Sequence, residues 1–261
     1  MGGVPIGVGG GGIALILFLV IALLTGNVPG GGGGEGGPLD PFSTVQSPGA
    51  TTTFEEGSVE DFVDRVHTDA EQMWIDLFRR ANREYRVSKL AVFTASTTSA
   101  CGGASAAVGP HYCPPDETVY IDVSFFQELR DRFGARGDPT GDFAQAYVVA
   151  HEVGHHVQKV LGLNDRVQNR EDAIRLELQA DCLAGVWGHT AEQRGLLDPG
   201  DVEEGLGAAA AVGDDRIQQR TQGRIDPESW THGSAEQRMR WFTRGMNNGD
   251  PGACDTFSGE L

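Results

Sequence analysis

His151 and His155 lie four residues apart in the stretch His151-Glu152-Val153-Gly154-His155, where the residue types most clearly indicate chemistry. If this stretch is helical, both imidazoles project from one face of the helix, about one turn apart. Two imidazoles at that separation can share a zinc ion at Zn–N distances of roughly 2.0–2.1 Å. Glu152 would reach a water at the metal without being a ligand itself. This HExxH spacing is typical of hydrolytic zinc sites.

A catalytic zinc needs a third protein ligand, and the next predicted helix offers one. Apolar residues recur at helical spacing over residues 170–194, and Glu177 and Asp181 share another face of that helix. We expect Glu177 to be the third ligand, with a water in the fourth position. We expect Asp181 to accept a hydrogen bond from a ligand imidazole and so fix its orientation. The alternative is that both acids lie on a solvated face, as Glu171 and Asp172 would.

Hydrolysis at such a metal also needs a second donor for the developing oxyanion. His232 is our candidate for this catalytic role, with Tyr112 and Tyr147 as further candidates. His232 stands just before a predicted helix with Ser234 as its N-cap, so the alternative is a helix-entry residue in a turn before Gly233.

The other histidines carry no ligand motif. His156 adjoins His155 but points about 100° away round the helix, so we expect it behind the site or at the surface. His67, His111 and His189 are expected to be structural.

The N-terminal region differs in composition from the rest of the chain. Residues 1–34 contain no charged side chain, and an unbroken apolar run extends from Ile13 to Leu24. The run alone is short for a bilayer, but the uncharged stretch from Val4 onward supplies about 20 residues, which is enough to span it. We predict a transmembrane anchor within residues 1–25, with a cleaved signal peptide as the alternative.

The rest of the chain then divides into a linker and one domain. Residues 26–57 are rich in Gly, Pro, Ser and Thr and are predicted to be a flexible linker. Residues 58–261 are predicted to form the folded domain. Either interpretation of the N-terminal segment places this domain outside the cytoplasm, on a single-pass membrane protein or as a secreted one. The net charge of −17 repels phosphate and argues against nucleic acid as a partner.

Four cysteines form an even set in a domain expected to be exported, which permits disulfides. We favour the pairs Cys101–Cys113 and Cys182–Cys254 because the first pair is local. Two other connectivities are possible, and four buried thiols are a further alternative. The sequence has no CxxC spacing, so a zinc site built from cysteines is not expected.

Periodicity and turn residues predict the following elements along the domain. These are a helix from Ser58 to about Asn82, a strand-like Tyr85–Phe93, a strand Val119–Val123, helices Ser124–Phe133, Asp142–Leu161, Arg170–Arg194 and Gly200–Arg220, a helix after Ser234, and a loop-rich tail Asn247–Leu261. The strand at residues 119–123 could pair with an extended peptide through its edge, or be purely structural.

Four blocks of the sequence together resemble a known family. HEVGHHVQKVLG, RLELQADCLAGVW and THGSAEQRMRWF, preceded by CGGASAAVGPHYCPPDETVYIDVSFF, are similar to the neutral zinc metallopeptidases of bacteria over roughly residues 58–257. The resemblance implies an anchored or exported protein with a gluzincin-like site. In it, His151, His155 and Glu177 match the zinc ligands and Glu152 the general base.

Residues and resemblance together lead to one expectation of fold and function. We expect an α+β fold, predominantly helical and zincin-like, with a small β-sheet beside the metal-binding helices and an N-terminal transmembrane helix before it. The working hypothesis is a membrane-anchored, Zn²⁺-dependent metallopeptidase that acts on a peptide or protein substrate. The alternatives are a zinc-containing envelope domain that binds partners without turnover, and a metal-free domain with a coincidental HExxH.

Overall fold

The computed structural model describes residues 54–105, 109–131, 142–259 and 261. The predicted anchor at residues 1–25 and residues 26–53 of the predicted linker lie outside this part of the chain. Among the helices within it, we find none that combines the length and the apolar character needed to cross a bilayer.

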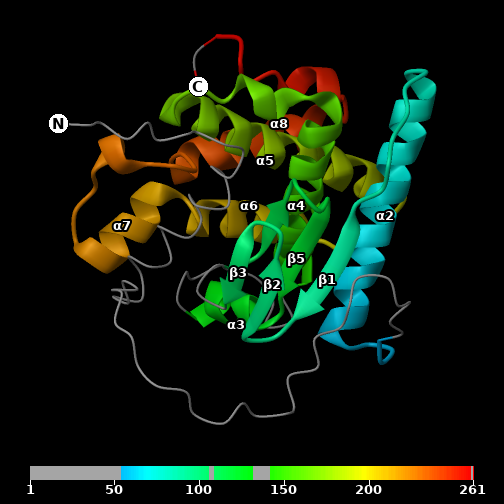
Figure 1. Ribbon diagram of the computed structural model, residues 1–261, viewed down its shortest axis with the longest axis horizontal. Coiled ribbons are helices and arrows are strands. Elements are labelled where there is room, and N and C mark those ends of the chain that lie inside the picture. Colours follow the sequence, from blue (N-terminus) through cyan, green and yellow to red (C-terminus); the bar gives the residue numbers. More distant parts are fainter. Residues whose placement is uncertain (1–53, 106–108, 132–141, 260) are drawn as a thin grey trace, which may run out of the picture.

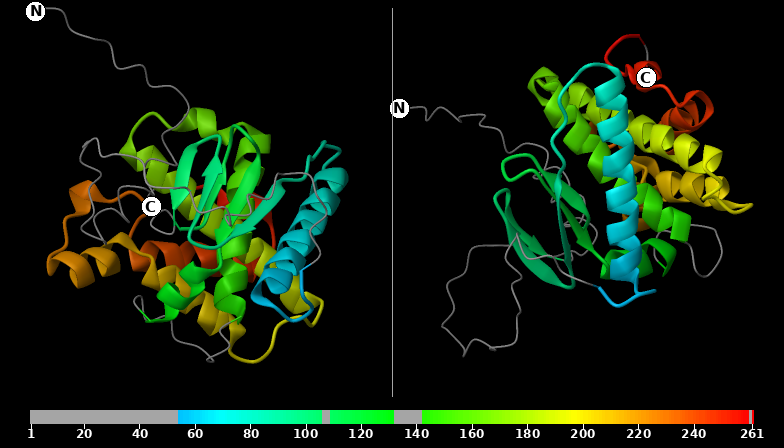
Figure 2. Two further views of the ribbon diagram at one scale, coloured as in Figure 1. Left: turned by 60° about the horizontal axis from the view of Figure 1, so that its bottom comes forward. Right: turned by 90° about the vertical axis from the view of Figure 1, so that its right-hand side faces the viewer.

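Helix α4 (Asp142–Leu161) lies at the centre of the fold and carries the HExxH residues. Its residues 143–158 are all buried, as expected for a helix that is apolar or small on most of its circumference. A small sheet covers one side of α4, and α5 (Arg170–Gln193) packs along the other, with α8 (Ala235–Asn248) beyond it (Figures 1 and 2). Helix α2 (Val59–Arg80) packs along α4 at the edge of this layer.

The main sheet has three strands in the order β1-β5-β4. β1 (Lys89–Phe93) runs parallel to β5 (Thr118–Asp122), and β4 (His111–Cys113) pairs antiparallel with β5 at the sheet edge. β2 (Ser96–Ser99) and β3 (Gly102–Ser105) form a separate hairpin. The expected α+β class is therefore confirmed, since the described residues are mostly helical and include a small three-stranded sheet.

One predicted strand begins later than expected, and the pairing of another favours one of its two alternatives. The strand-like segment Tyr85–Phe93 is extended in the sheet only from Lys89, because Ser88 instead donates its backbone N–H to Glu71 Oε1 at 3.0 Å. In the predicted strand at residues 119–123, which is β5, β1 pairs along one edge and β4 pairs with residues 118–120 on the other. This pairing favours the purely structural alternative for β5, and the edge strand beside α4 is β4.

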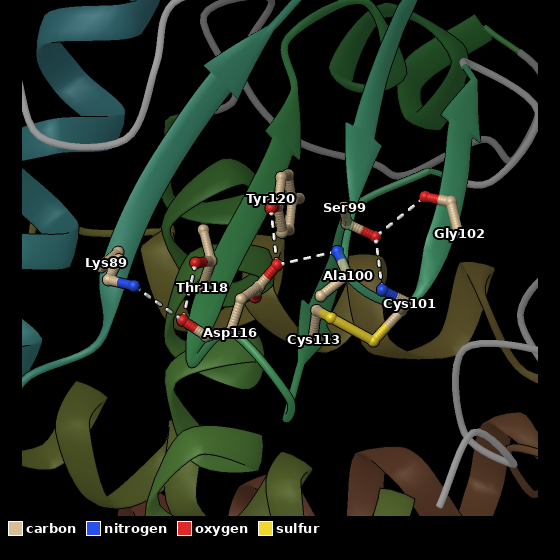
Figure 3. Close-up of a disulfide and its surroundings, with 9 residues drawn as sticks. All are labelled: Lys89, Ser99, Ala100, Cys101, Gly102, Cys113, Asp116, Thr118 and Tyr120. Carbon is tan, nitrogen blue, oxygen red and sulfur yellow. Dashed lines mark hydrogen bonds between the residues drawn. A yellow bond between two sulfur atoms is a disulfide. The ribbon is translucent and has the colours of Figure 1, made fainter.

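The β2–β3 hairpin is fastened to the main sheet by the predicted disulfide Cys101–Cys113 and by Asp116 (Figure 3). The Asp116 carboxylate accepts hydrogen bonds from the Ala100 backbone N–H and the Tyr120 hydroxyl, both at 2.9 Å. The second predicted disulfide, Cys182–Cys254, is also present, and the structure leaves no free cysteine among the residues that it describes. Both predicted pairings are confirmed.

Helices α5 and α8 cross in close contact through glycines. A Cβ on Gly185 would lie 2.2 Å from the Phe242 carbonyl oxygen, and a Cβ on Gly245 would lie 2.0 Å from the Cys182 carbonyl oxygen. No larger residue fits at either position without moving a helix. This close crossing brings the buried residues of α8 against the metal-facing side of α5.

Side-chain caps set the helix starts. Ser58 caps α2, Asn169 caps α5, and Ser234 forms a reciprocal capping box with Gln237 at the start of α8. These starts agree with the sequence prediction, as does the full extent of α4. The remaining described elements are α3 (Ser124–Asp131), α6 (Asp201–Ala211), α7 (Asp214–Gln222) and the short 3-10 turns Leu163–Arg166, Pro227–Ser229 and Pro251–Cys254.

The single helix predicted over Gly200–Arg220 was wrong, because the chain breaks at Val212 and Gly213 to give α6 and α7. A Cβ on Gly213 would lie 2.3 Å from the Ala235 backbone nitrogen, so this break is packed tightly against the start of α8. The break also turns Asp214 toward the loop before α8, which matters for the site.

Candidate metal site

His151 and His155 project from α4 toward Glu177 on α5. His151 Nε2 lies 3.4 Å from Glu177 Oε2, and His155 Nε2 lies 3.5 Å from Glu177 Oε1. One ligand atom from each of the three residues falls within 4.8 Å of the others. All three side chains are buried, so the two imidazoles and the carboxylate converge in a space largely shielded from solvent.

These distances fit a zinc ion. Tetrahedral coordination at roughly 2.0–2.1 Å places neighbouring ligand atoms roughly 3.3 Å apart, close to the two separations observed. Two imidazole nitrogens and one carboxylate oxygen are also a donor set that catalytic zinc sites use. Within the described residues, the Glu177 carboxylate has no ion-pair partner other than these two imidazoles. The three residues therefore fit the metal that the sequence predicts.

The electrostatics keep Glu177 ionised. Burial alone would raise the pKa of the Glu177 carboxyl, but the neighbouring His155, followed by His151, holds it well below its usual range. An ionised carboxylate can bind a cation directly. The negative charge of Glu177 is thus available to a metal at neutral pH.

A buried charged cluster supports His151. Asp181 Oδ1 lies 2.9 Å from His151 Nδ1, although this approach does not meet hydrogen-bond geometry. Arg238 donates from Nε to Asp181 Oδ2 at 2.9 Å and from Nη2 to Oδ1 at 2.8 Å, and the Tyr147 hydroxyl donates to Oδ1 at 2.5 Å. Asp181 therefore lies behind His151, where the sequence predicted it.

Charge dominates the behaviour of this cluster. Burial opposes ionisation of Asp181, but Arg238 and then His151 lower its pKa below the usual value. Burial would lower the pKa of His151, but the Asp181 carboxylate outweighs it and raises that pKa to about 9. In the metal-free protein His151 is therefore protonated at neutral pH. Arg238 was not predicted from the sequence, because α8 contains several arginines and no local pattern distinguishes this one.

His155 has a different, uncharged support. Its Nδ1 lies 2.9 Å from Gln158 Oε1, one turn further along α4. Gln158 is fully buried and was also not singled out from the sequence. The signal was present in the spacing, because residues 151, 155 and 158 follow one helical face.

His232 is buried beside the site and is held by Asp214. Asp214 Oδ2 accepts the backbone N–H groups of residues 231, 232 and 233, at 2.6, 2.6 and 3.0 Å. Its Oδ1 lies 3.2 Å from His232 Nδ1. Burial would lower the pKa of His232, but Asp214 and then Glu177 raise it above its ordinary value. Nothing in the sequence pointed to Asp214, since only the break before α7 brings it to this loop.

Glu152 lies beside the first ligand on α4 and is 7% exposed. Among the described residues its carboxylate has neither a hydrogen-bond partner nor an ion-pair partner. A nearly buried carboxylate without a protein partner is free to engage a water or a substrate. This is the condition that the predicted general base requires.

The two tyrosines named as further oxyanion donors already have partners. The Tyr147 hydroxyl bonds to Asp181 and accepts from Arg238 Nη2 at 3.1 Å. The Tyr112 hydroxyl lies 2.9 Å from His156 Nδ1. Both arrangements argue against an oxyanion role, which leaves His232 as the candidate.

The four remaining histidines lie in structural positions. His156 is fully buried, and its Nε2 contacts the Arg86 carbonyl oxygen at 2.5 Å, so it lies behind the site and not at the surface. His67 bonds to Ser88 Oγ at 2.8 Å, and His111 stacks on Tyr120. His189 lies 2.6 Å from the Met246 carbonyl oxygen.

Comparison with known proteins gives a consistent picture. The sequence model of the family described as "Putative neutral zinc metallopeptidase" matches residues 1–257. Uncharacterized protein YpfJ of Escherichia coli strain K12 is 43% identical over 264 residues, which cover 95% of this chain and 87% of the relative. Uncharacterized protein Rv2575 of Mycobacterium tuberculosis strain H37Rv is 50% identical over 189 residues, which cover 67% of this chain and 64% of the relative. No solved structure matches the chain.

Proposed function

Because the chain belongs to the neutral zinc metallopeptidase family, we propose that it hydrolyses peptide bonds at a zinc ion held by His151, His155 and Glu177. The observation that carries this proposal is the convergence of three buried ligand groups, in which each imidazole Nε2 lies 3.4–3.5 Å from an oxygen of Glu177 and one ligand atom from each residue lies within 4.8 Å of the others. Bound there, zinc supplies a Lewis acid that acidifies water and polarises a carbonyl group. The remaining steps belong to side chains of the protein.

Glu152 is the proposed general base. Its carboxylate would take the proton of the attacking water and deliver it to the leaving amine, which typically contributes about 10²–10⁴-fold to the rate. The lack of a hydrogen-bond partner for Glu152 among the described residues supports this role, since none of their hydrogen bonds has to break before the proton moves.

His232 is the proposed donor to the oxyanion. Asp214 engages Nδ1 and the backbone on either side of the ring, while Nε2 has no hydrogen-bond partner in the described part of the chain. The raised pKa of His232 keeps the imidazole protonated through a wider pH range, so Nε2–H can donate. A single donor of this kind is worth about 10²–10³-fold in kcat.

The edge strand β4 is the proposed support for the substrate backbone. It packs against α4, pairs with β5 on one side, and has no strand on its other side among the described residues. An extended peptide can add to such an edge through backbone hydrogen bonds.

We also propose that residues 1–25 anchor the enzyme in the membrane with the catalytic domain extracytoplasmic. The apolar run at residues 13–24 supports this, and so do the two disulfides, which persist in oxidising compartments.

The test is a comparison of wild type with Glu152→Gln on a peptide library, with zinc measured in both. We expect about one zinc per chain in both proteins and cleavage by wild type alone. Retained cleavage by Glu152→Gln would contradict the mechanism. Zinc in both proteins with no cleavage by either would favour a binding domain, the alternative function.

A further inference from the structure

A continuous chain of buried amides runs from the ligand His155 to the C-terminal segment. Gln158 Oε1 faces His155 Nδ1 at 2.9 Å, and Gln158 Nε2 donates to the Leu176 carbonyl oxygen at 2.7 Å. Gln158 Nε2 also donates to Gln179 Oε1 at 3.1 Å, and Gln179 Nε2 donates to the Cys254 carbonyl oxygen at 2.9 Å. Three elements, α4, α5 and the 3-10 turn Pro251–Cys254, are thus linked through two glutamine side chains.

Two backbone carbonyls fix the direction of every bond in this chain. A carbonyl oxygen only accepts, so the Gln179 amide must turn its nitrogen to Cys254 and its oxygen to Gln158. Gln158 must likewise turn its nitrogen toward Leu176 and Gln179, which leaves its oxygen facing His155. An oxygen acceptor at that position requires a proton on His155 Nδ1. The Nε2 lone pair is then left to point at Glu177 and the metal position.

The Cys254 end of this series of hydrogen-bonded amides is fixed to α5. Cys254 is buried and joined to Cys182 by the disulfide. Beyond it, Thr256 Oγ1 donates to the Arg175 carbonyl oxygen at 2.6 Å, and Arg175 Nη1 donates to the Thr256 carbonyl oxygen at 2.5 Å. The segment after α8 therefore lies along the face of α5 that carries residues 175, 179 and 182.

We propose that Gln158 and Gln179 are positioning residues for the zinc ligand His155, and that the disulfide-bonded segment around Cys254 is the anchor that sets their direction. The inference rests on the proposed zinc site, because it concerns how one ligand presents its nitrogen. Removal of a hydrogen-bond partner behind a metal ligand typically changes metal affinity about 10–100-fold. The C-terminal segment is in this respect part of the metal site.

The first test is a graded series of glutamine-to-methionine variants, which keep side-chain length and remove the amide. Gln158→Met should weaken zinc binding about 10–100-fold and Gln179→Met by less, in chelator competition. Gln193→Met, on the exposed side of α5, is the matched control and should bind like wild type. The visible spectrum of the cobalt-substituted protein should change in the same order, because it reports ligand geometry. Unchanged affinity and spectrum in folded Gln158→Met and Gln179→Met would overturn the proposal.

A second measurement needs no variant and so cannot fail through misfolding. Nitrogen-15 NMR of the imidazoles in the full-length wild-type protein should show His155 protonated at Nδ1 without metal, and coordinated through Nε2 with zinc. Coordination through Nδ1 would overturn the amide chain while leaving the zinc site intact. A wild-type protein that binds neither zinc nor cobalt would instead contradict the proposed function, and the metal-free tautomer would still test the amide chain.

Discussion

The two proposed ligand imidazoles on α4, His151 and His155, are supported in different ways. Behind His151 lies a charged cluster in which Asp181 is held by Arg238 and Tyr147. Behind His155 lies a neutral chain of amides that begins at Gln158. The first support acts through charge, because a carboxylate attracts the proton on Nδ1 and raises the pKa of His151 to about 9. The second acts through the orientation of the amides. The Leu176 and Cys254 carbonyl oxygens accept from the amide nitrogens, so the Gln158 amide oxygen must face His155.

The difference shows how one metal site can make one imidazole more basic and fix the tautomer of the other. A carboxylate behind an imidazole makes it a stronger ligand but also a stronger base, so the metal must compete with a proton. An amide behind an imidazole fixes the tautomer without adding charge. We expect removal of the two supports to have different effects on stability, zinc affinity and the pH dependence of zinc binding. The following changes test this.

The largest effect is expected from Arg238→Met. It removes Arg238 from the fully buried Asp181, whose remaining cationic neighbour is His151, and breaking a buried pair in this way costs about 3–5 kcal/mol of unfolding free energy. Arg240→Met, at an exposed position of the same helix, should stay within about 0.5 kcal/mol of wild type in urea unfolding of the metal-free protein. The double variant Asp181→Asn with Arg238→Met should recover part of the loss. Equal stability of the two arginine variants would show that the charged cluster is not buried as described.

Removal of each disulfide should test next whether the segment around Cys254 supports His155. The Cys182–Cys254 bridge spans 72 residues, and its loss through Cys182→Ser with Cys254→Ser should cost about 4 kcal/mol by loop entropy. The Cys101–Cys113 bridge spans 12 residues, and the corresponding serine pair should cost about 3 kcal/mol. Thermal melts give the stabilities. Chelator competition on the folded proteins should show weaker zinc binding only for the variant that lacks Cys182–Cys254. Equal zinc affinities of the two variants would show that the C-terminal segment does not support the metal site.

The smallest expected effect is on the pH dependence of zinc binding. His151 is protonated below about pH 9 in the metal-free protein, and zinc requires the neutral ring, so affinity should fall about tenfold per pH unit as the pH drops below 9. Asp181→Asn removes the charge that raises this pKa, so the fall should begin at a lower pH. Gln158→Met should leave the pH at which it begins unchanged. If zinc affinity begins to fall at the same pH in Asp181→Asn and Gln158→Met, the assignment would be contradicted. Asp181 would then not be the residue that controls protonation of His151.

The sequence predicted much of this arrangement because the ligands lie on two strongly periodic helices. Glu177 and Asp181 follow from helical spacing once a third ligand is sought, and the structure brings both to the expected place. The full extent of α4 and both disulfide pairings also agree with prediction.

What the sequence did not predict depends on contacts between distant segments. Arg238 and Asp214 reach the site only because α8 crosses α5 at two glycines and the chain breaks at Gly213. Strand β4 is three residues long, too short for an alternating pattern, so the sequence offered only residues 119–123 as a possible peptide-binding edge. No local pattern records such contacts. Membrane anchoring by residues 1–25 remains a prediction.

The central claim is that His151, His155 and Glu177 hold one zinc ion between α4 and α5. Anomalous diffraction on either side of the zinc absorption edge, from crystals of the protein purified without added metal chelator, tests it most directly. We predict a single peak that lies within roughly 2.0–2.3 Å of His151 Nε2, His155 Nε2 and a Glu177 carboxylate oxygen. A zinc-loaded protein whose peak lies elsewhere, or protein soaked in zinc that shows no peak at these residues, would contradict it.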